Sequence, residues 1–314
     1  MSNKEIIREK NFVSAVVYVR NQESEIGIFL ETVDHVLQTY FEKYEIICVN
    51  DASTDHSCEG VREYAKESRG NAITVLNMSF YQGLEISMNA GVDFAIGDFV
   101  FEFDSANVTY PAELIMKVYE RALSGFDIVA ACPQKCGHRL SEFFYKVYNA
   151  ASSTQYPLRT EAFRILSRRA INRVHGMSKT MPYRKAVYAN CGLKSGCVMF
   201  DLESSLPKAK GIEYENQKVT GVDALMLYTN LAYRFSMSLS VLMMMITVFM
   251  AGYTVIIYMT GKPVEGWTTT ILFLAFSFFG IFTMLTISVR YLCLLLKVVF
   301  NNQKYLVESV EKLK

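Results

Sequence analysis

Two long apolar stretches near the C-terminus constrain this 314-residue chain more than any other feature. Residues 235–261 and 266–289 contain no charged side chain, and only a few residues separate them. A helix of about 20 apolar residues crosses the roughly 30 Å of hydrocarbon in a bilayer, so each stretch is long enough to span a membrane. The pattern predicts a transmembrane helical hairpin. The alternative is a pair of helices buried in a protein core.

Basic residues flank this predicted hairpin on one side. Arg234 precedes the first stretch, and Arg290, Lys297 and Lys304 follow the second, whereas the short connection holds one Lys and one Glu. The positive-inside tendency then places both termini and the soluble part in the cytoplasm. Residues 1–10 are polar and charged, so we expect no cleavable signal. The predicted location is the cell (inner) membrane, with a multi-pass topology.

The segment before the apolar stretches alternates strand and helix patterns. Because helices separate the strands, we expect an α/β fold with a mainly parallel, Rossmann-like sheet covered on both faces. Ligands of such sheets bind where the strands end, and the polar loops 50–55 and 104–109 lie there. The predicted strands are 12–19, 44–49, 72–76, 98–103 and 126–131, and the predicted helices are 24–40, 53–65, 86–95 and 111–123.

Charge is divided unevenly along this segment. Residues 1–130 carry 10 Lys and Arg against 21 Asp and Glu, whereas residues 131–185 carry 11 against 2. The acidic part suggests carboxylates that bind a metal or the hydroxyls of a ribose and base. The basic part, close to a membrane hairpin, suggests contact with a lipid phosphate or anionic headgroups, and the alternative is a solvated face without a ligand. We expect no nucleic-acid partner, because no motif of that kind is present.

Several motifs occur in a characteristic order. They are 45–55 (EIICVNDASTD), 83–91 (GLEISMNAG), Gly97-Asp98 followed by Asp104, 111–115 (PAELI) and 163–168 (FRILSR). With the hairpin, this order resembles glycosyltransferase family 2, in particular its polyprenyl-phosphate branch of dolichol-phosphate mannose synthases and bactoprenol glucosyltransferases. The resemblance implies a GT-A fold and an inverting sugar transfer from a UDP- or GDP-linked nucleotide sugar to a polyprenyl phosphate.

The residue patterns and the resemblance together predict an organisation of the chain. A cytoplasmic GT-A glycosyltransferase domain is expected over 1–215, followed by an interfacial amphipathic helix over 216–234. Two transmembrane helices are expected within 235–290, and a C-terminal juxtamembrane helix over 291–314.

On the donor side, the resemblance implies that Asp51 accepts hydrogen bonds from the base or ribose. A turn or helix cap is the alternative for Asp51. Asp104 matches the first carboxylate of the family's D-x-D metal motif, with an ordinary strand-end turn as the alternative. The second carboxylate is replaced by Ala106 or Asn107, so Mg²⁺ or Mn²⁺ would be held weakly. The expected donor-binding residues are Tyr18, Arg20, Asn21, Asn50, Asp51, Gly83, Asp104 and Asn107, with Asp104 and Asn107 as metal ligands.

On the acceptor side, the family's phosphate site corresponds to Arg164, Ser167 and Arg168. A helix over 163–174 would place these three on one face, and the alternative is a solvated helix face. Lys135 and Arg139 follow the fifth strand and are expected to assist. Asp104, Arg164 and Arg168 are thus the expected catalytic residues.

The expected product is a lipid-linked sugar that serves cell-envelope glycan modification. A non-catalytic relative that binds a nucleotide sugar or assembles with a membrane partner is the main alternative. A processive polysaccharide synthase would need more spanning helices than this sequence contains. Self-association into a homo-oligomer is left open.

Overall fold

The structure is a computed structural model of the whole chain, which divides into two compact units. One unit comprises residues 1–221 together with 302–314, and the other comprises 222–301. The residues that the structure describes are 8–68, 72–134, 139–152, 156–177, 183–202, 229, 231–259, 266–300 and 305–314.

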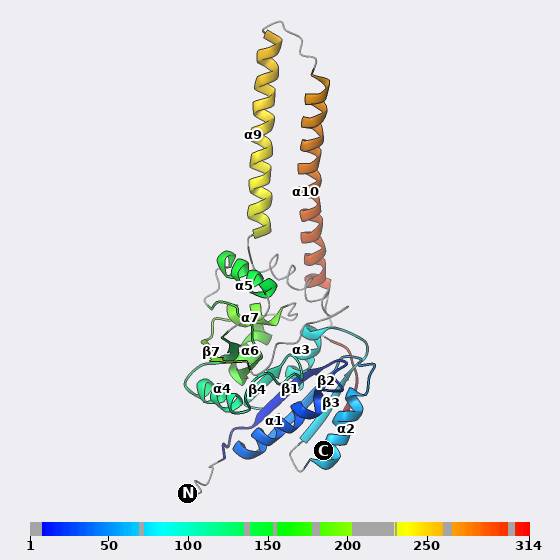
Figure 1. Ribbon diagram of the computed structural model, residues 1–314, viewed down its shortest axis with the longest axis vertical. Coiled ribbons are helices and arrows are strands. Elements are labelled where there is room, and N and C mark those ends of the chain that lie inside the picture. Colours follow the sequence, from blue (N-terminus) through cyan, green and yellow to red (C-terminus); the bar gives the residue numbers. More distant parts are fainter. Residues whose placement is uncertain are drawn as a thin grey trace. The chain divides into compact units, whose positions relative to one another are not determined.

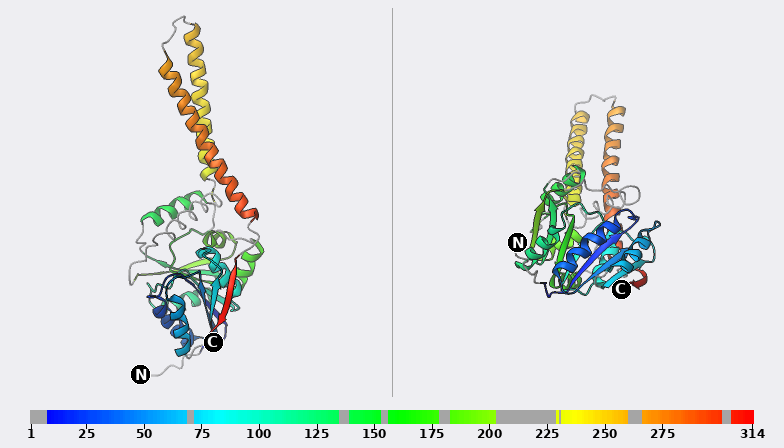
Figure 2. Two further views of the ribbon diagram at one scale, coloured as in Figure 1. Left: turned by 90° about the vertical axis from the view of Figure 1, so that its right-hand side faces the viewer. Right: turned by 60° about the horizontal axis from the view of Figure 1, so that its bottom comes forward.

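The first unit, whose sheet and helices are drawn in Figures 1 and 2, is built on an eight-stranded sheet. The strand order of this sheet is β7-β5-β6-β4-β1-β2-β3-β8. Its pairs β1–β2, β1–β4, β2–β3 and β5–β7 are parallel, whereas β6 runs antiparallel to β4 and β5, and β8 antiparallel to β3. The strands are β1 (Val13–Val19), β2 (Tyr44–Asn50), β3 (Ala72–Met78), β4 (Phe99–Phe103), β5 (Ile128–Pro133), β6 (Phe163–Ser167), β7 (Ser195–Phe200) and β8 (Val307–Lys312).

Helices cover both faces of this sheet. The main core joins one face to apolar side chains of α1 and α4, including Phe29 and Ile115. On the other face α3 packs so closely that a Cβ at Gly91 would lie 2.4 Å from Val16 Cγ1, which requires glycine there. The helices of this unit are α1 (Ile26–Tyr40), α2 (Ser57–Glu67), α3 (Leu84–Phe94), α4 (Glu113–Leu123), α5 (Arg139–Ala151), α6 (Arg168–Met177) and α7 (Arg184–Asn190).

The predicted α/β alternation and mainly parallel sheet are confirmed. All five strands and four helices predicted between residues 12 and 131 overlap an observed element. These strands are continuous apolar runs because both of their faces are covered: every residue of β1 is buried.

The predicted helix over 163–174 is wrong at its start. Residues 163–167 form β6, and α6 begins only at Arg168. The segment inserts between β4 and β5, where its backbone pairs on both sides and where Phe163 and Ile165 enter the core. This pairing overrides the helical spacing of the sequence.

The predicted juxtamembrane helix over 291–314 is also wrong in its second half. A helix continues to Phe300, but residues 307–312 form β8 on the edge of the sheet (red in Figure 2). The exposed edge of β3 supplies backbone partners, from Thr74 opposite Lys312 to Met78 opposite Val307. Such a partner is remote in sequence, so local periodicity does not reveal it.

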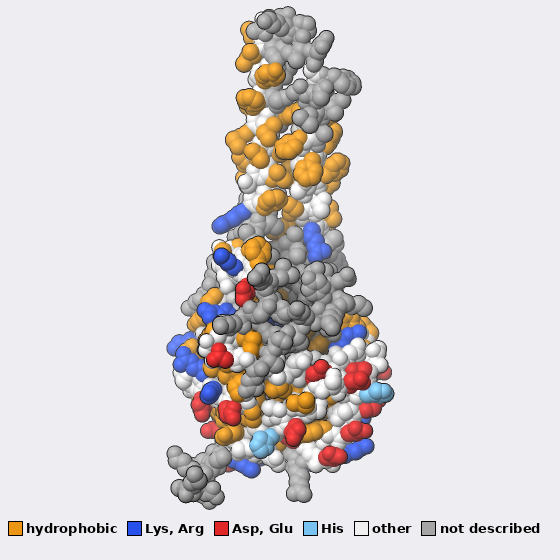
Figure 3. Space-filling model, viewed as in Figure 1, with side chains coloured by type: hydrophobic (Ala, Val, Ile, Leu, Met, Phe, Trp, Pro, Cys, Tyr) orange, Lys and Arg blue, Asp and Glu red, His pale blue; other side chains and the backbone are white. Residues whose placement is uncertain are grey.

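The second unit contains two long helices in the region of the predicted hairpin. They are α9 (Leu231–Met259) and α10 (Trp267–Phe300). Apolar side chains are exposed along both, such as Phe249 at 73% and Phe279 at 69% (Figure 3). Across the described residues, no helix combines the length and the apolar character that crossing a membrane requires. Membrane insertion of the pair stays a prediction. Most of the predicted interfacial helix, 216–234, lies outside the described residues.

Candidate active site

Asp51 follows β2 directly and is completely buried. Its carboxylate accepts hydrogen bonds from Tyr18 Oη at 3.0 Å and from the backbone N–H groups of Gln82 and Gly83, both at 2.8 Å. Gly83 is the N-cap residue of α3, so the negative charge lies at the positive end of a helix. Asp51 thereby fixes the loop 79–83, which joins β3 to α3.

The turn after Asp51 has an unusual backbone. Ala52 has a φ of 53°, in the left-handed region that favours glycine. The guanidinium of Arg20 stabilises this turn by donating hydrogen bonds to the carbonyl oxygens of Asp51 at 2.5 Å and Ala52 at 3.0 Å. The same guanidinium stacks on the Tyr81 ring, 4.1 Å from its centroid. Arg20 therefore joins the turn after β2 to the loop before α3.

Two asparagines complete this region. The Asn21 side chain accepts a hydrogen bond from the Thr54 N–H at 2.8 Å, and Asn50 Oδ1 accepts one from the Ser53 N–H at 3.0 Å. Asn50 Nδ2 also donates to Asn77 Oδ1 at 2.9 Å. The structure thus brings the predicted donor-binding residues Tyr18, Arg20, Asn21, Asn50, Asp51 and Gly83 together where β1, β2 and β3 end.

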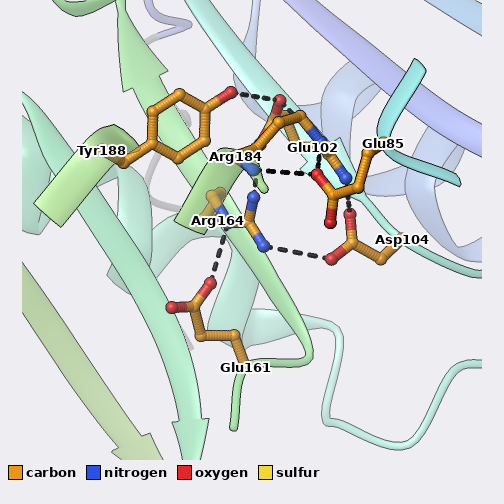
Figure 4. A network of polar contacts seen from close by, with 7 residues as sticks. All are labelled: Glu85, Glu102, Asp104, Glu161, Arg164, Arg184 and Tyr188. Atoms are coloured by element: carbon orange, nitrogen blue, oxygen red, sulfur yellow. Dashed lines mark hydrogen bonds and ion pairs between the residues drawn. The ribbon is translucent and has the colours of Figure 1, made fainter. Parts of the chain in front are cut away.

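A second cluster lies at the end of β4. Arg164 on β6 is opposite Glu102, and its Nη1 lies 2.8 Å from Glu102 Oε2, while Nη2 lies 3.0 Å from Asp104 Oδ2. Arg184, the first residue of α7, pairs in the same way with the other oxygens, at 2.9 Å from Glu102 and 2.7 Å from Asp104. The two guanidinium groups therefore hold both carboxylates between them (Figure 4).

Three further side chains surround this four-residue core. Glu161 lies 2.8 Å from Arg164 Nε, and Glu85 lies 2.9 Å from Arg184 Nε. The hydroxyl of Tyr188 donates to Glu102 Oε1 at 2.8 Å. We call these seven residues the arginine–carboxylate cluster: Glu85, Glu102, Asp104, Glu161, Arg164, Arg184 and Tyr188.

Burial and charge act in opposite directions on this cluster. Burial by itself raises the pKa of Asp104, but Arg164 and Arg184 outweigh it and hold that pKa well below the usual range. For the arginines, burial lowers the pKa and the surrounding carboxylates raise it well above the ordinary value. Both guanidinium groups therefore stay charged although only 2% and 1% of these side chains are exposed.

The predicted acceptor residues do not share one face. Arg164 belongs to the arginine–carboxylate cluster, whereas Ser167 donates to Asp127 Oδ1 at 2.9 Å. Arg168 donates to the backbone carbonyls of Ala95 and Gly97 and connects the start of β4 to α6. Lys135 and the side chain of Arg139 lie outside the described residues.

The sequence patterns do not predict four of the site residues: Arg184, Glu85, Glu161 and Tyr188. Glu102 could be suspected, because it precedes Asp104 by two residues on one strand face. Arg184 carries no such signal, since α7 is separated from β4 by some 80 residues.

The oxygen atoms of the cluster are compatible with binding a divalent cation. The cluster contains four carboxylates and two arginines. Lys185, which also lowers the pKa of Asp104, adds a third positive charge, so one negative charge remains in excess. Each oxygen of Asp104 accepts one hydrogen bond from an arginine, which leaves a lone pair, and 22% of the side chain is exposed. Among the described residues, no group of three or more His, Cys, Asp or Glu could hold a metal alone. Asn107 Nδ2 donates to Ser105 Oγ at 2.6 Å.

A cavity of about 210 Å³ adjoins the cluster on the side of β5 and β7. Its wall is mostly apolar but includes charged side chains. The lining includes Ala130, Cys132, Leu158, Glu161, Arg164 and Lys185.

The profile of glycosyl transferase family 2 matches residues 14–192, more than half of the chain. The chain therefore belongs to glycosyl transferase family 2. The fold agrees: the mannosyltransferase PcManGT from Pyrobaculum calidifontis, solved with GDP-Man and Mn²⁺, superposes with a TM-score of 0.52 at 18% identity. That match covers 70% of this chain and 63% of the mannosyltransferase. The GT-A fold expected from the sequence is thus confirmed.

Curated relatives point to one branch of this family. An uncharacterised glycosyltransferase of Synechocystis is 29% identical, with 61% of each chain covered. A prophage bactoprenol glucosyl transferase homolog of Escherichia coli is 28% identical over 60% of this chain and 62% of its own, so both matches span less than two thirds of the relative. The bactoprenol glucosyl transferase of Shigella phage SfX is 26% identical over 67% and 71%. The names of the two bactoprenol relatives confirm the resemblance to the polyprenyl-phosphate branch.

Proposed function

We propose that the chain transfers a sugar from a nucleotide sugar to a polyprenyl phosphate, with inversion at the anomeric carbon. This proposal rests mainly on two buried arginines that converge on Asp104. Asp104 lies at the strand end where the family resemblance implies the donor diphosphate. The region around Asp51 belongs to the same end of the sheet. Family membership and the names of the bactoprenol relatives support the donor and acceptor classes.

The proposed chemistry is a single displacement. An acceptor phosphate oxygen is already anionic at neutral pH, so it forms the new bond to the anomeric carbon without a protein general base. The bond from that carbon to the donor diphosphate breaks at the same time, and its electron pair leaves with the nucleoside diphosphate. The protein must orient the two phosphates in line and stabilise the departing charge. Arg164 and Arg184 are placed to do so when they exchange part of their carboxylate contacts for phosphate oxygens.

Asp104 would hold a divalent cation together with the donor diphosphate, and the Asn107 side chain would assist. When bound, Mg²⁺ or Mn²⁺ would neutralise developing charge on the leaving group. A magnesium site of this kind needs only one or two carboxylates, because substrate phosphates and water supply the other ligands. The PcManGT complex with GDP-Man and Mn²⁺ supports this assignment by fold alone.

The acceptor places this reaction at a membrane. In this proposal α9 and α10 anchor the chain in lipid, with the GT-A domain and both termini in the cytoplasm. Exposed apolar side chains along both helices support such contact, for example Met245 at 59% and Phe282 at 62%. The product would be a polyprenyl-phosphate sugar for later transfer to cell-envelope glycans. Resistance of the membrane-bound chain to extraction with alkaline carbonate tests the anchor.

The function is tested by incubating membranes that contain the chain with polyprenyl phosphate and a panel of radiolabelled UDP- and GDP-sugars. We expect one donor to transfer label to a lipid that organic solvent extracts. Membranes with the Asp104→Asn variant serve as the control. If no donor labels a lipid although the purified chain binds a nucleotide, the proposed reaction is wrong.

A non-catalytic binding subunit is the second candidate. It is favoured by the pairing of both arginines with Asp104, because Arg164 and Arg184 must give up part of these contacts before they can bind a substrate phosphate. Nucleotide-sugar binding without any transfer in the same assay would support this candidate.

A further inference from the structure

The C-terminal segment contacts the loop 79–83 directly. Leu306 is joined to Gln82 by two hydrogen bonds: its N–H donates to Gln82 Oε1 at 2.9 Å, and its carbonyl accepts from Gln82 Nε2 at 2.6 Å. The same carbonyl accepts from the Ser79 N–H at 3.1 Å. Tyr305 adds a hydrogen bond to Asp93 on α3 at 3.1 Å. The loop 79–83 and the helix that follows are thus fastened to residues 305 and 306.

The same loop is also fastened to Asp51. The Gln82 backbone N–H donates to Asp51, while the Gln82 side chain contacts Leu306. Tyr81, in the same loop, supports Arg20, which in turn holds the Asp51 turn. A single residue, Gln82, therefore contacts both the C-terminal segment and Asp51.

A second link runs through β8 itself. Asn77 Nδ2 donates to Ser309 Oγ at 3.0 Å and to Glu311 Oε1 at 2.7 Å, and its Oδ1 accepts from Asn50. Glu311 is also held by Arg62 through two hydrogen bonds, at 2.9 and 3.0 Å. The orientation of Asn50, one of the predicted donor-binding residues, thus depends on β8.

We infer that β8 and residues 305–306 position the donor site, with Gln82 and Asn77 as positioning residues that transmit the placement of the C-terminus to Asp51 and Asn50. This inference rests on the proposed function, because it takes the Asp51 region as the nucleotide site. Its consequence is that the last ten residues, although they follow the apolar helices in the chain, determine affinity for the nucleotide donor.

The first test is isothermal titration of the 314-residue chain with UDP and, separately, with GDP, in the presence of Mn²⁺. Gln82→Ala should weaken binding about tenfold, the order expected when the hydrogen bonds that order a binding loop are lost. In turnover assays the KM for the nucleotide sugar should rise, with kcat and the KM for polyprenyl phosphate close to wild type. The matched control is Glu308→Ala. Glu308 is an exposed residue of β8, and this variant should bind the nucleotide with wild-type affinity.

A second pair of variants separates positioning from general stability. Arg62→Ala and Glu311→Ala both delete the same ion pair, but only Glu311→Ala also removes a partner of Asn77. Weaker nucleotide binding by Glu311→Ala alone supports the inference even if Gln82→Ala fails to fold. Equal affinities of wild type, Gln82→Ala and Glu311→Ala would overturn it. Absence of nucleotide binding by the wild type would instead overturn the proposed function.

Discussion

Arg184 Nη2 lies 2.7 Å from Asp104 Oδ1, although the two residues are 80 positions apart in the chain. Arg184 is 1% exposed and is the first residue of α7, whereas Asp104 follows β4 at the sheet end where the donor is expected. With Arg164 on the other oxygen, this contact joins Asp104 of the acidic segment 1–130 to two arginines of the basic segment 131–185. The acidic and basic segments of the sequence therefore meet at this carboxylate.

Replacing Arg184 should strongly destabilise the soluble domain. Arg184→Ala leaves Glu102 buried with one partner fewer, and breaking a buried pair from one side costs about 3–5 kcal/mol. Denaturant unfolding measures this loss. The comparison is Arg169→Ala, which removes a guanidinium that is 71% exposed in its pair with the buried Asp127 and should therefore destabilise the domain less than Arg184→Ala. Equal effects of the two variants would contradict the buried role of Arg184.

The stability of the cluster should depend on acid in a defined direction. Because the folded pKa of Asp104 is depressed, its contribution is fully present above the unfolded pKa of about 3.9 and is lost as the pH falls through the folded value. The difference in unfolding free energy between wild type and Asp104→Asn should thus be constant from about pH 5 to 7 and shrink only under strongly acidic conditions. A difference that already declines near neutral pH would show that Asp104 is not the titrating group.

The turn after β2 offers a stabilising substitution. Ala52→Gly removes the strain of an alanine at a φ of 53° and adds the chain entropy of glycine. The net effect should be a gain of roughly 0.5 kcal/mol, because the strain exceeds the entropy term. Thermal unfolding in parallel with Gly27→Ala, at an open helical position, provides the comparison. A loss of stability in Ala52→Gly would mean that the methyl group makes a contact that matters.

Divalent metal should increase activity, with Asp104 more important than Asn107. Asp104 supplies a charged oxygen at the cluster, whereas Asn107 is neutral and donates to Ser105. We expect chelation to reduce sugar transfer and Asp104→Asn to be more damaging than Asn107→Ala. Full turnover in excess chelator would show that the two arginines alone carry the diphosphate charge.

The sequence is sufficient to predict the mainly parallel sheet and the polar residues that follow its strands. Continuous apolar runs and the polar residues at their ends are local patterns, so they locate β1 to β5, Asp51 and Asp104. The arginine–carboxylate cluster is predictable only in part. The spacing of Arg164 to Ser167 and Arg168 suits a helix, whereas backbone pairing with β4 and β5 makes this segment a strand.

The remaining differences come from contacts between distant segments. β8 forms because β3 offers an edge for pairing, and nothing in residues 307–312 alone reveals that partner. The family resemblance implies direct contact of Asp51 with the donor, yet its buried carboxylate is engaged by Tyr18, Gln82 and Gly83. Direct contact with the donor therefore stays a prediction, while the role of Asp51 in fixing the loop 79–83 is visible.

The arginine–carboxylate cluster is the proposed reaction centre. The most direct test is the rate of lipid-linked sugar formation by Asp104→Asn at saturating nucleotide sugar and polyprenyl phosphate, with folding and nucleotide affinity measured on the same preparation. We predict a rate at least about 100-fold below wild type, the usual effect of removing one group from a preorganised charged site, with the fold retained. A folded, nucleotide-binding Asp104→Asn variant that forms the product at the wild-type rate would contradict this claim.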